Sequence, residues 1–301
     1  MQSPTYNAQE KWGRIAAAGG YVLWGLLPLF WKLLDTIPAI ELLAHRVVWS
    51  LVFLILILAV MSQWDVLAQV SNNPRKYLPF VASAVILAIN WFTYIYAMNT
   101  DRVVSASLGY FINPLFSVVL GVVFLRERLR FWQWSAVGLA LIGVLYLTMQ
   151  FGQIPWIALV LAFTFGVYGL IRKTAPLGSL HGLSLEMTLL FIPALCFLIV
   201  LNVRQVGHFA HAGFSTNFLL MLTGVVTALP LLLFAFGAKR ITLASIGILQ
   251  YIAPSLQFLL GVFLYREPFT TGKLIGFLFI WTALILYTLE GVLFRRHKSK
   301  I

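Results

Sequence analysis

Charged residues are scarce in this 301-residue chain. Only 10% of its residues are Asp, Glu, Lys or Arg, and nine of these are acids, whereas 61% of all residues are hydrophobic. A soluble domain could not bury that much apolar surface, so we expect lipid to surround most of the chain. The net charge of +12 then reflects basic loops on one side of a membrane, and nucleic acid is excluded as a partner.

Cysteine and catalytic motifs are also nearly absent. Cys196 is the single cysteine, which excludes an internal disulfide and a thiolate metal site. No nucleotide-binding motif occurs, so direct use of ATP is not expected. His208 and His211 have a metal-ligand spacing but no third ligand beside them. We therefore predict no metal, no cofactor and no catalytic residue.

Long apolar segments make up almost all of the chain. Ten can be counted, each near the ~20 residues that cross about 30 Å of hydrocarbon. Backbone groups in lipid must be satisfied within their own segment, so each segment is predicted to be a helix. The segments lie at 13–34, 40–61, 77–98, 103–125, 131–149, 153–171, 183–202, 215–238, 243–265 and 271–293. The expected fold is an all-α integral membrane protein with ten transmembrane helices and membrane lipid as a partner.

The basic residues predict the orientation of these helices. Cytoplasmic segments carry an excess of Lys and Arg. A cytoplasmic N-terminus places 15 of the 21 basic residues inside. These are Lys11, Arg14, Arg75, Lys76, Arg126, Arg128, Arg130, Arg172, Lys173, Lys239, Arg240, Arg295, Arg296, Lys298 and Lys300. An even number of helices then leaves the C-terminus cytoplasmic as well.

One stretch of the sequence occurs twice. SASLGYFINPLFSVVLGVVFLRE, at 105–127, returns 140 residues later as SIGILQYIAPSLQFLLGVFLYRE, at 245–267. A spacing this long indicates two halves of one design rather than a solenoid. Five helices in each half make the second half enter the membrane from the opposite face, which predicts inverted repeats. We expect five-helix repeats at 13–149 and 153–294 in one transmembrane unit, with cytoplasmic tails at 1–12 and 295–301.

Each copy of this stretch is interrupted by a proline. Pro114 and Pro254 each remove one helical donor and free the carbonyl four residues earlier. Free backbone groups at the bilayer midplane need partners from protein or a watery cavity, and matched breaks in inverted halves indicate a transporter binding site. Kinks that serve only helix packing are the alternative. The predicted substrate-binding residues at the breaks are Tyr110, Asn113, Gln250 and Tyr251.

Aromatic and amide side chains on other segments extend this candidate site. They suit an amphipathic ligand that carries a ring, although such residues are equally ordinary in helix packing. The additional candidates are Asn90, Trp91, Tyr94, Trp24 and Tyr168.

Polar residues within the second apolar segment form a further candidate site. Glu41 and His45 are one helical turn apart, with Arg46 beside them, and a carboxylate next to an imidazole can pass protons. An ion pair that anchors the end of the helix is the alternative.

Glu186 holds the corresponding place in the seventh segment. It either carries a proton or pairs with Lys173 or Arg172. Inversion places Lys32 and His45 toward the outside, and Lys173 and Glu186 toward the inside, as two polar gates. Snorkelling of both lysines to the membrane interface is the alternative.

The chain resembles the RarD family, the chloramphenicol-sensitive branch of the drug/metabolite transporter superfamily with duplicated EamA-type domains. The resemblance rests on HRVVWS at 45–50, NW at 90–91, ASLGYFINP at 106–114, QYIAP at 250–254, GLIRK at 169–173 and Glu186. It covers almost the whole chain, with Ala253 where the family tends to have glycine. The resemblance implies ten helices, a bacterial inner-membrane location, a central cavity that opens alternately to each side, and transport of metabolites or drugs. We expect no enzymatic activity.

We therefore expect a secondary transporter that exports a small amphipathic metabolite or drug, with protons as a candidate coupling ion. A non-transporting membrane scaffold is one alternative, although a scaffold has no need of a polar midplane. A membrane-embedded lipid-modifying enzyme is the other, although the acids are scattered between distant helices.

Overall fold

The computed structural model describes residues 4–64, 77–100, 102–149, 156–266 and 271–298. All regular secondary structure in these ranges is helical. The α-helices are α1 (Pro4–Trp31), α2 (Ala39–Val60), α4 (Leu78–Asn99), α5 (Val103–Leu125), α6 (Phe131–Met149), α7 (Trp156–Thr174), α8 (Ser179–Val203), α9 (Gly213–Ala238), α10 (Leu243–Gln250), α11 (Ile252–Leu259) and α12 (Thr271–Lys298). A 3₁₀ turn (Lys32–Leu34) follows α1, and a π-helical turn (Leu260–Leu264) follows α11.

Ten helical segments in the described ranges are long and apolar enough to span a membrane. Helix α10, α11 and the π-helical turn together form one of them, Leu243–Leu264. Much of each helix surface is apolar and faces outward, where lipid replaces water as the solvent. The prediction of an all-α protein with ten transmembrane helices is confirmed.

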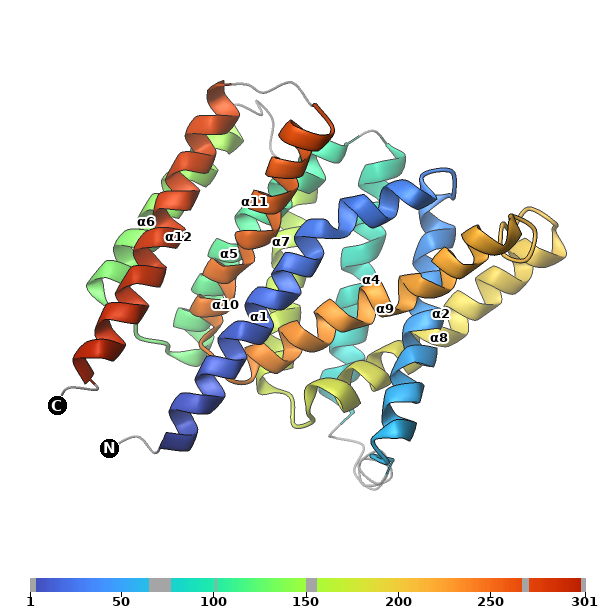
Figure 1. Ribbon diagram of the computed structural model, residues 1–301, viewed down its shortest axis with the longest axis horizontal. Helices are drawn as coiled ribbons and strands as arrows, with labels where there is room; N and C mark the ends of the chain where they lie inside the picture. The colour runs from blue at the N-terminus through green and yellow to red at the C-terminus, as the bar shows by residue number, and fades with distance from the viewer. Residues whose placement is uncertain (1–3, 65–76, 101, 150–155, 267–270, 299–301) are drawn as a thin grey trace.

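The helices form one bundle whose two termini lie at the same end of the molecule (Figure 1). Helices α6 and α12 pack together along one edge, and the α8–α9 hairpin extends from the opposite edge. Helices α1, α4, α5, α7, α10 and α11 lie between these edges. Which side of a membrane the terminal end faces stays a prediction.

Packing between the helices has a two-fold pattern. Helix α1 packs against α9 as α7 packs against α4, and α2 packs against α9 as α8 packs against α4. Likewise α5 packs against α7 as α10 and α11 pack against α1. The pairs α2–α8, α5–α10 and α6–α12 each join a helix to its own counterpart. This pattern is what two related five-helix repeats would produce, while the exact repeat boundaries stay a prediction.

Helix ends repeat as well. Ser62 after α2 and Gln205 after α8 both adopt left-handed backbone, with φ of 52° and 56°. In each case the next residue donates its N–H to a carbonyl five residues earlier, at 3.1 Å, which is the Schellman helix end. Arg126 and Arg266, after α5 and the π-helical turn, share φ values of 53° and 54°. Non-glycine residues rarely adopt this conformation, so its recurrence reflects equivalent local structure.

The two proline-containing helices differ from each other. Helix α5 runs through Pro114 without interruption, so the predicted break is wrong for the first copy. A single proline removes only one donor, and the neighbouring hydrogen bonds keep the helix continuous. The second copy is divided at Tyr251, whose N–H bonds to the carbonyl of Ile248 in a tighter, 3₁₀-type turn at 3.2 Å.

Candidate functional site

A cavity of about 210 Å³ lies inside the bundle. Its walls come from α1, α2, α4, α5, α7, α9, α10 and α11, and hence from both halves of the chain. Eight residues predicted for substrate binding or gating line it: Trp24, Arg46, Asn90, Trp91, Tyr94, Tyr110, Asn113 and Gln250. The structure thus brings together residues that are up to 226 positions apart in sequence, from Trp24 to Gln250.

The cavity lies in the half of the bundle away from the termini. On α1 its lining runs from Tyr21 to Trp31, at the C-terminal part of the helix. On α5 its lining lies between Ser107 and Asn113, in the N-terminal part. Both of these parts face the end of the bundle opposite the termini.

Equivalent positions of the two repeats meet in this cavity. Tyr110 and Gln250 correspond, as do Asn113 and Ala253, and all four line it. Asn113 and Gln250 are only 3% and 5% exposed, yet their side-chain oxygens have no hydrogen-bond partner among the residues that the structure describes. Buried amide oxygens without partners are costly, so these two atoms are available to a polar ligand or water.

Aromatic rings make up much of the remaining wall. Trp24 packs edge-on against Phe165 with ring centroids 5.7 Å apart, and Tyr94 packs edge-on against Tyr110 at 6.4 Å. Asn90 is held by hydrogen bonds to the carbonyl of Leu161 at 3.1 Å and to the Thr164 hydroxyl at 2.8 Å. Asn90 therefore shapes the wall, while the rings offer flat apolar surface.

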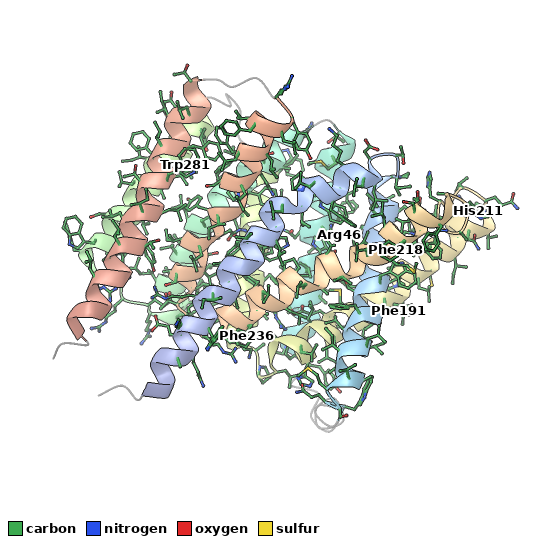
Figure 2. The ribbon with its side chains drawn as sticks, viewed as in Figure 1. Arg46, Phe191, His211, Phe218, Phe236 and Trp281 are labelled. Atoms are coloured by element: carbon green, nitrogen blue, oxygen red, sulfur yellow. The ribbon has the colours of Figure 1, made fainter. Side chains whose placement is uncertain are left out.

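Arg46 supplies a positive charge to the cavity. Its Nε donates to the Thr227 hydroxyl at 3.0 Å, and its guanidinium carbon lies 5.1 Å and 5.0 Å from the Trp31 and Trp91 rings. Figure 2 shows Arg46 inside the bundle, whereas His211 lies at the far tip of the α8–α9 hairpin. Sequence reasoning had grouped Arg46 with Glu41 and His45, but its side chain points to the cavity.

Two predicted substrate residues do not line the cavity. Tyr251 is fully buried, and its hydroxyl donates to the Phe111 carbonyl at 3.2 Å, in the cluster that packs α6 against α12. Tyr168 is also fully buried and donates to Glu186 at 3.0 Å. Both tyrosines serve packing in this structure.

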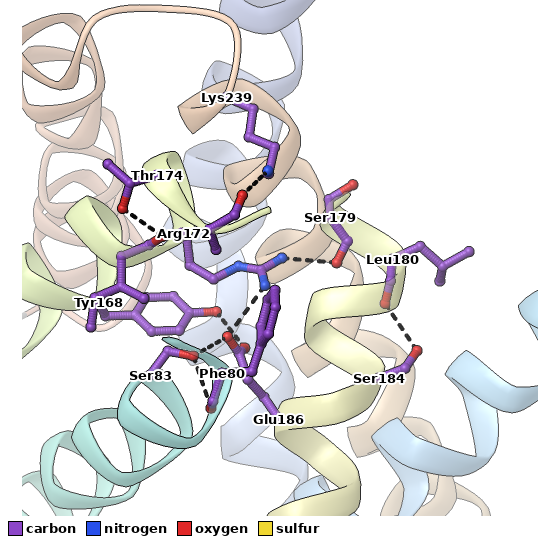
Figure 3. A network of polar contacts seen from close by, with 12 residues as sticks. Phe80, Ser83, Tyr168, Arg172, Thr174, Ser179, Leu180, Ser184, Glu186 and Lys239 are labelled. Carbon is purple, nitrogen blue, oxygen red and sulfur yellow. Dashed lines mark hydrogen bonds and ion pairs between the residues drawn. The ribbon is translucent and has the colours of Figure 1, made fainter. Parts of the chain in front are cut away.

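Glu186 belongs to a buried polar cluster near the terminal end of the bundle (Figure 3). It pairs with Arg172 at 3.3 Å and accepts hydrogen bonds from Ser83 at 2.5 Å and Tyr168 at 3.0 Å. Arg172 also donates to the Ser179 carbonyl at 2.9 Å, and both charged side chains have 0% exposure. Of the two predicted partners of Glu186, Arg172 is the one it contacts, and the cluster ties α4, α7 and α8 together.

Lys173 and Glu127 join helix ends at the same level. Lys173 donates to the carbonyls of Ala238 and Ile241, at 3.1 Å and 2.5 Å, where its charge complements the C-terminal end of α9. Glu127 accepts from the backbone N–H groups of Leu243 and Ala244, at 2.6 Å and 2.9 Å, and so caps α10. These contacts close the terminal end of the bundle beneath the cavity.

Lys239, at the end of α9, belongs to this closed region. It donates to the Ala175 carbonyl at 2.6 Å. Burial lowers the pKa of Lys239, and the nearby charges of Arg172 and Arg240 lower it further. Three basic residues, Lys239, Arg172 and Arg240, therefore lie close together in this region.

A second polar cluster lies at the opposite end, where α2 meets the α8–α9 loop. Glu41 is 2% exposed and accepts from both the backbone N–H and the Nδ1 of His208, at 2.7 Å and 2.8 Å. His45 lies 3.8 Å from Glu41, and within the described part of the chain its two ring nitrogens have no hydrogen-bond partner. Phe209 packs against the His45 ring at 5.3 Å. This second cluster therefore joins the two halves of the chain through the contact between Glu41 and His208.

Lys32 is exposed and its ammonium lies 4.4 Å from the centre of the Tyr265 ring. It does not line the cavity. Whether Lys32 acts in a gate or snorkels to the membrane interface stays a prediction.

Several residues of the two sites escaped prediction from the sequence, among them Trp31, Thr227 and His208. Trp31 and Thr227 line the cavity, and Thr227 fixes Arg46. Nothing in the sequence distinguishes them from other residues of apolar helices. His208 was considered only as a metal ligand, whereas it binds Glu41; a basic residue in the loop opposite a buried acid was the available signal.

Known proteins share both the sequence and the fold. The profile of the EamA-like transporter family matches residues 11–149. The chain is 45% identical to "Uncharacterized transporter YojE" of Bacillus subtilis (strain 168), over 96% of this chain and 98% of that protein. It is 43% identical to "Protein RarD" of Streptomyces exfoliatus, over 94% and 90%. One solved crystal structure shares the fold, with a TM-score of 0.68 at 18% identity over 92% of this chain and 97% of that one.

Proposed function

Because this chain belongs to the RarD family of the drug/metabolite transporter superfamily, and is a multi-pass membrane transporter, we propose that it exports small amphipathic metabolites or drugs across the bacterial inner membrane. The solute binds in the cavity between the halves. Transport is secondary, driven by a gradient rather than by ATP.

The observation that carries this proposal is the meeting of equivalent residues in one cavity. Tyr110 and Asn113 from the first repeat face the same space as Gln250 and Ala253 from the second. A site shared by two related halves is where relative motion of the halves can expose a solute to either side. Aromatic walls with two unpartnered amide oxygens suit a solute that has an apolar body and polar groups.

The closed terminal end supports alternating access. Beneath the cavity, Phe234 packs against Tyr21, Phe165 and Tyr168, with ring centroids 6.2, 5.3 and 5.9 Å apart. The Arg172–Glu186 pair lies in the same region. Transport then requires the terminal end to open while the Glu41–His208 end is closed. The Arg172–Glu186 cluster and the Glu41–His208 cluster would act as the two gates.

Three substitutions test the site. Tyr110→Ala, Asn113→Ala and Gln250→Ala are each expected to reduce solute flux into proteoliposomes by roughly tenfold, the effect of losing about one good polar or ring contact. Chloramphenicol and a mixed cell extract provide the solutes. Tyr251→Phe is the matched control, because Tyr251 adjoins Gln250 in sequence but faces away from the cavity.

Flux that stays unchanged in all three variants would remove the cavity from the transport path. If the wild-type protein moves no component of the mixture, the transporter proposal fails as well. In that case a scaffold that co-purifies with a fixed partner, or a lipid-modifying enzyme, becomes the better reading.

We further propose that export is coupled to protons through Glu41 and His45. Both ring nitrogens of His45 are buried without a hydrogen-bond partner in the described ranges, and its Nε2 lies 3.8 Å from the Glu41 carboxylate, which His208 also contacts. A His45→Ala variant is expected to transport without the pH dependence of the wild-type protein. Glu186→Gln tests the other acid in the same assay, with thermal unfolding as the check that the reconstituted variant is folded. A pH dependence of transport that persists in both variants contradicts proton coupling through His45 and Glu186.

A further inference from the structure

We propose that the cavity selects organic anions, with the negative group held at Arg46 and an apolar or aromatic body against the tryptophans beside it. This inference rests on the proposed function and adds the charge of the substrate. The family description refers to chloramphenicol, which is neutral, whereas the positive charge of Arg46 in this cavity favours an anion.

Arg46 is held in place but not neutralised. Thr227 accepts from its Nε, and Trp31 and Trp91 lie about its guanidinium at 5.1 Å and 5.0 Å. In the part of the chain that the structure describes, no carboxylate lies within ion-pair distance of Arg46, and no side chain or carbonyl accepts from its two terminal nitrogens. The donors that remain are those that bind a carboxylate with two parallel hydrogen bonds.

Acids are missing from the rest of the cavity wall too. Among the described residues, Arg46 is the one charged side chain that lines the cavity. Glu41, five residues earlier on the same helix, is turned to the end of the bundle and binds His208. An unpaired charge inside a membrane protein is costly and marks a functional site by default. A bound anion would supply the missing partner.

The surroundings of Arg46 define the rest of the ligand. Trp31 and Trp91 leave an aromatic lining next to the charge, and Trp24 and Phe165 continue it deeper in the cavity. Such flat apolar surface accepts a ring or a hydrocarbon body. The substrate class that fits is an aryl or alkyl carboxylate rather than a small inorganic anion.

Two matched ligand series test the selectivity of the purified full-length protein by titration calorimetry. One series is 3-phenylpropanoate, 3-phenylpropanamide and 3-phenylpropylamine, and the other is indole-3-acetate, indole-3-acetamide and tryptamine. Each series keeps the ring and changes the charge. We expect each carboxylate to bind at least roughly tenfold more tightly than its amide, as one charge-assisted pair provides, and the amines to bind most weakly.

Variants assign this preference to Arg46. Arg46→Gln is expected to bind carboxylate and amide equally, and Arg46→Lys to retain a reduced preference because it keeps the charge but loses the planar fork. Lys32→Gln is the matched control, since it removes the same charge from the end of α1 outside the cavity. The wild-type comparison stands by itself if an Arg46 variant does not fold.

Equal binding of carboxylate and amide by the wild-type protein overturns the inference, and so does a preference that survives in Arg46→Gln. The proposed function stands in either case if the protein still binds these ligands or moves chloramphenicol or an extract component. If no ligand binds and no solute crosses the membrane, both the inference and the proposed function fail.

Discussion

At the scale of single residues, the buried Arg172–Glu186 pair shows how this protein keeps charge inside a membrane. Both side chains are fully buried, and each has hydrogen bonds besides the ion pair. Desolvating two charges is compensated only when the geometry is good and the remaining polar atoms have partners. Arg172 Nε has no hydrogen-bond partner among the described residues, so this compensation is incomplete, and the pair joins α7 to α8 at the cost of one unsatisfied donor.

Glu186→Gln is expected to destabilise the folded protein by ~3–5 kcal/mol, because it leaves Arg172 buried without a counter-charge. Thermal unfolding of the detergent-purified variant measures this. The control is Glu10→Gln, which breaks the partly exposed Arg14 pair and should cost about 0.2–1 kcal/mol. A midpoint for Glu186→Gln as high as that of the control would contradict a stabilising role for the buried pair.

Side-chain direction is the part of the site that the sequence could not supply. Gln250 and Tyr251 are neighbours, and successive residues of a helix point about 100° apart, yet only Gln250 lines the cavity. Choosing between them requires knowing which helices pack on which side, and that depends on contacts between distant segments. The same holds for Arg46 and Glu41, which share a helix but serve different regions.

At the scale of helices, close approach between the halves depends on glycine, which has no side chain to separate two backbones. A Cβ atom at Gly247 would overlap the Pro114 carbonyl of α5 and lie 3.1 Å from the Ser117 Cβ. Small residues allow helices in membranes to pack with their backbones in near contact. Helices α5 and α10, which both line the cavity, are joined at this point.

Gly247→Ala is accordingly expected to lower stability by about 1–3 kcal/mol through overpacking and to reduce transport. Gly138→Ala on α6 is the matched control, because nothing lies within 4 Å of the added atom. Alanine is the better helix former, so this control should be as stable as the wild type or slightly more so. Equal behaviour of the two variants in thermal unfolding would show that the α5–α10 contact is not tight.

The sequence predicted the helices themselves well, since length and hydropathy decide whether a segment can span lipid. It overestimated the effect of proline, which divides the second repeated helix near Pro254 but leaves α5 whole. Whether a helix tolerates proline depends on its neighbours as well as on the residue. Those neighbours are set by tertiary packing.

At the scale of the whole molecule, inversion of the two repeats makes a prediction about sidedness. Ser62 and Gln205 occupy matching exposed helix ends, and an inverted architecture places them on opposite sides of the membrane. In a Cys196→Ala background, Ser62→Cys should react with an impermeant maleimide only after cells are permeabilised. Gln205→Cys should react in intact cells. Labelling of both from the same side would rule out inverted repeats.

The difference between unbroken α5 and divided α10–α11 also bears on where the carrier rests between cycles. Two identical halves would exchange conformations on going from one access state to the other, and the two states would then have equal free energy. Here α5 is continuous whereas its counterpart is divided into α10 and α11, so an exchange of conformations would force both halves into a less favoured geometry. A difference of about 1.4 kcal/mol already populates one state tenfold over the other. In the proposed cycle, this mismatch between the repeats would favour one access state of the empty protein over the other.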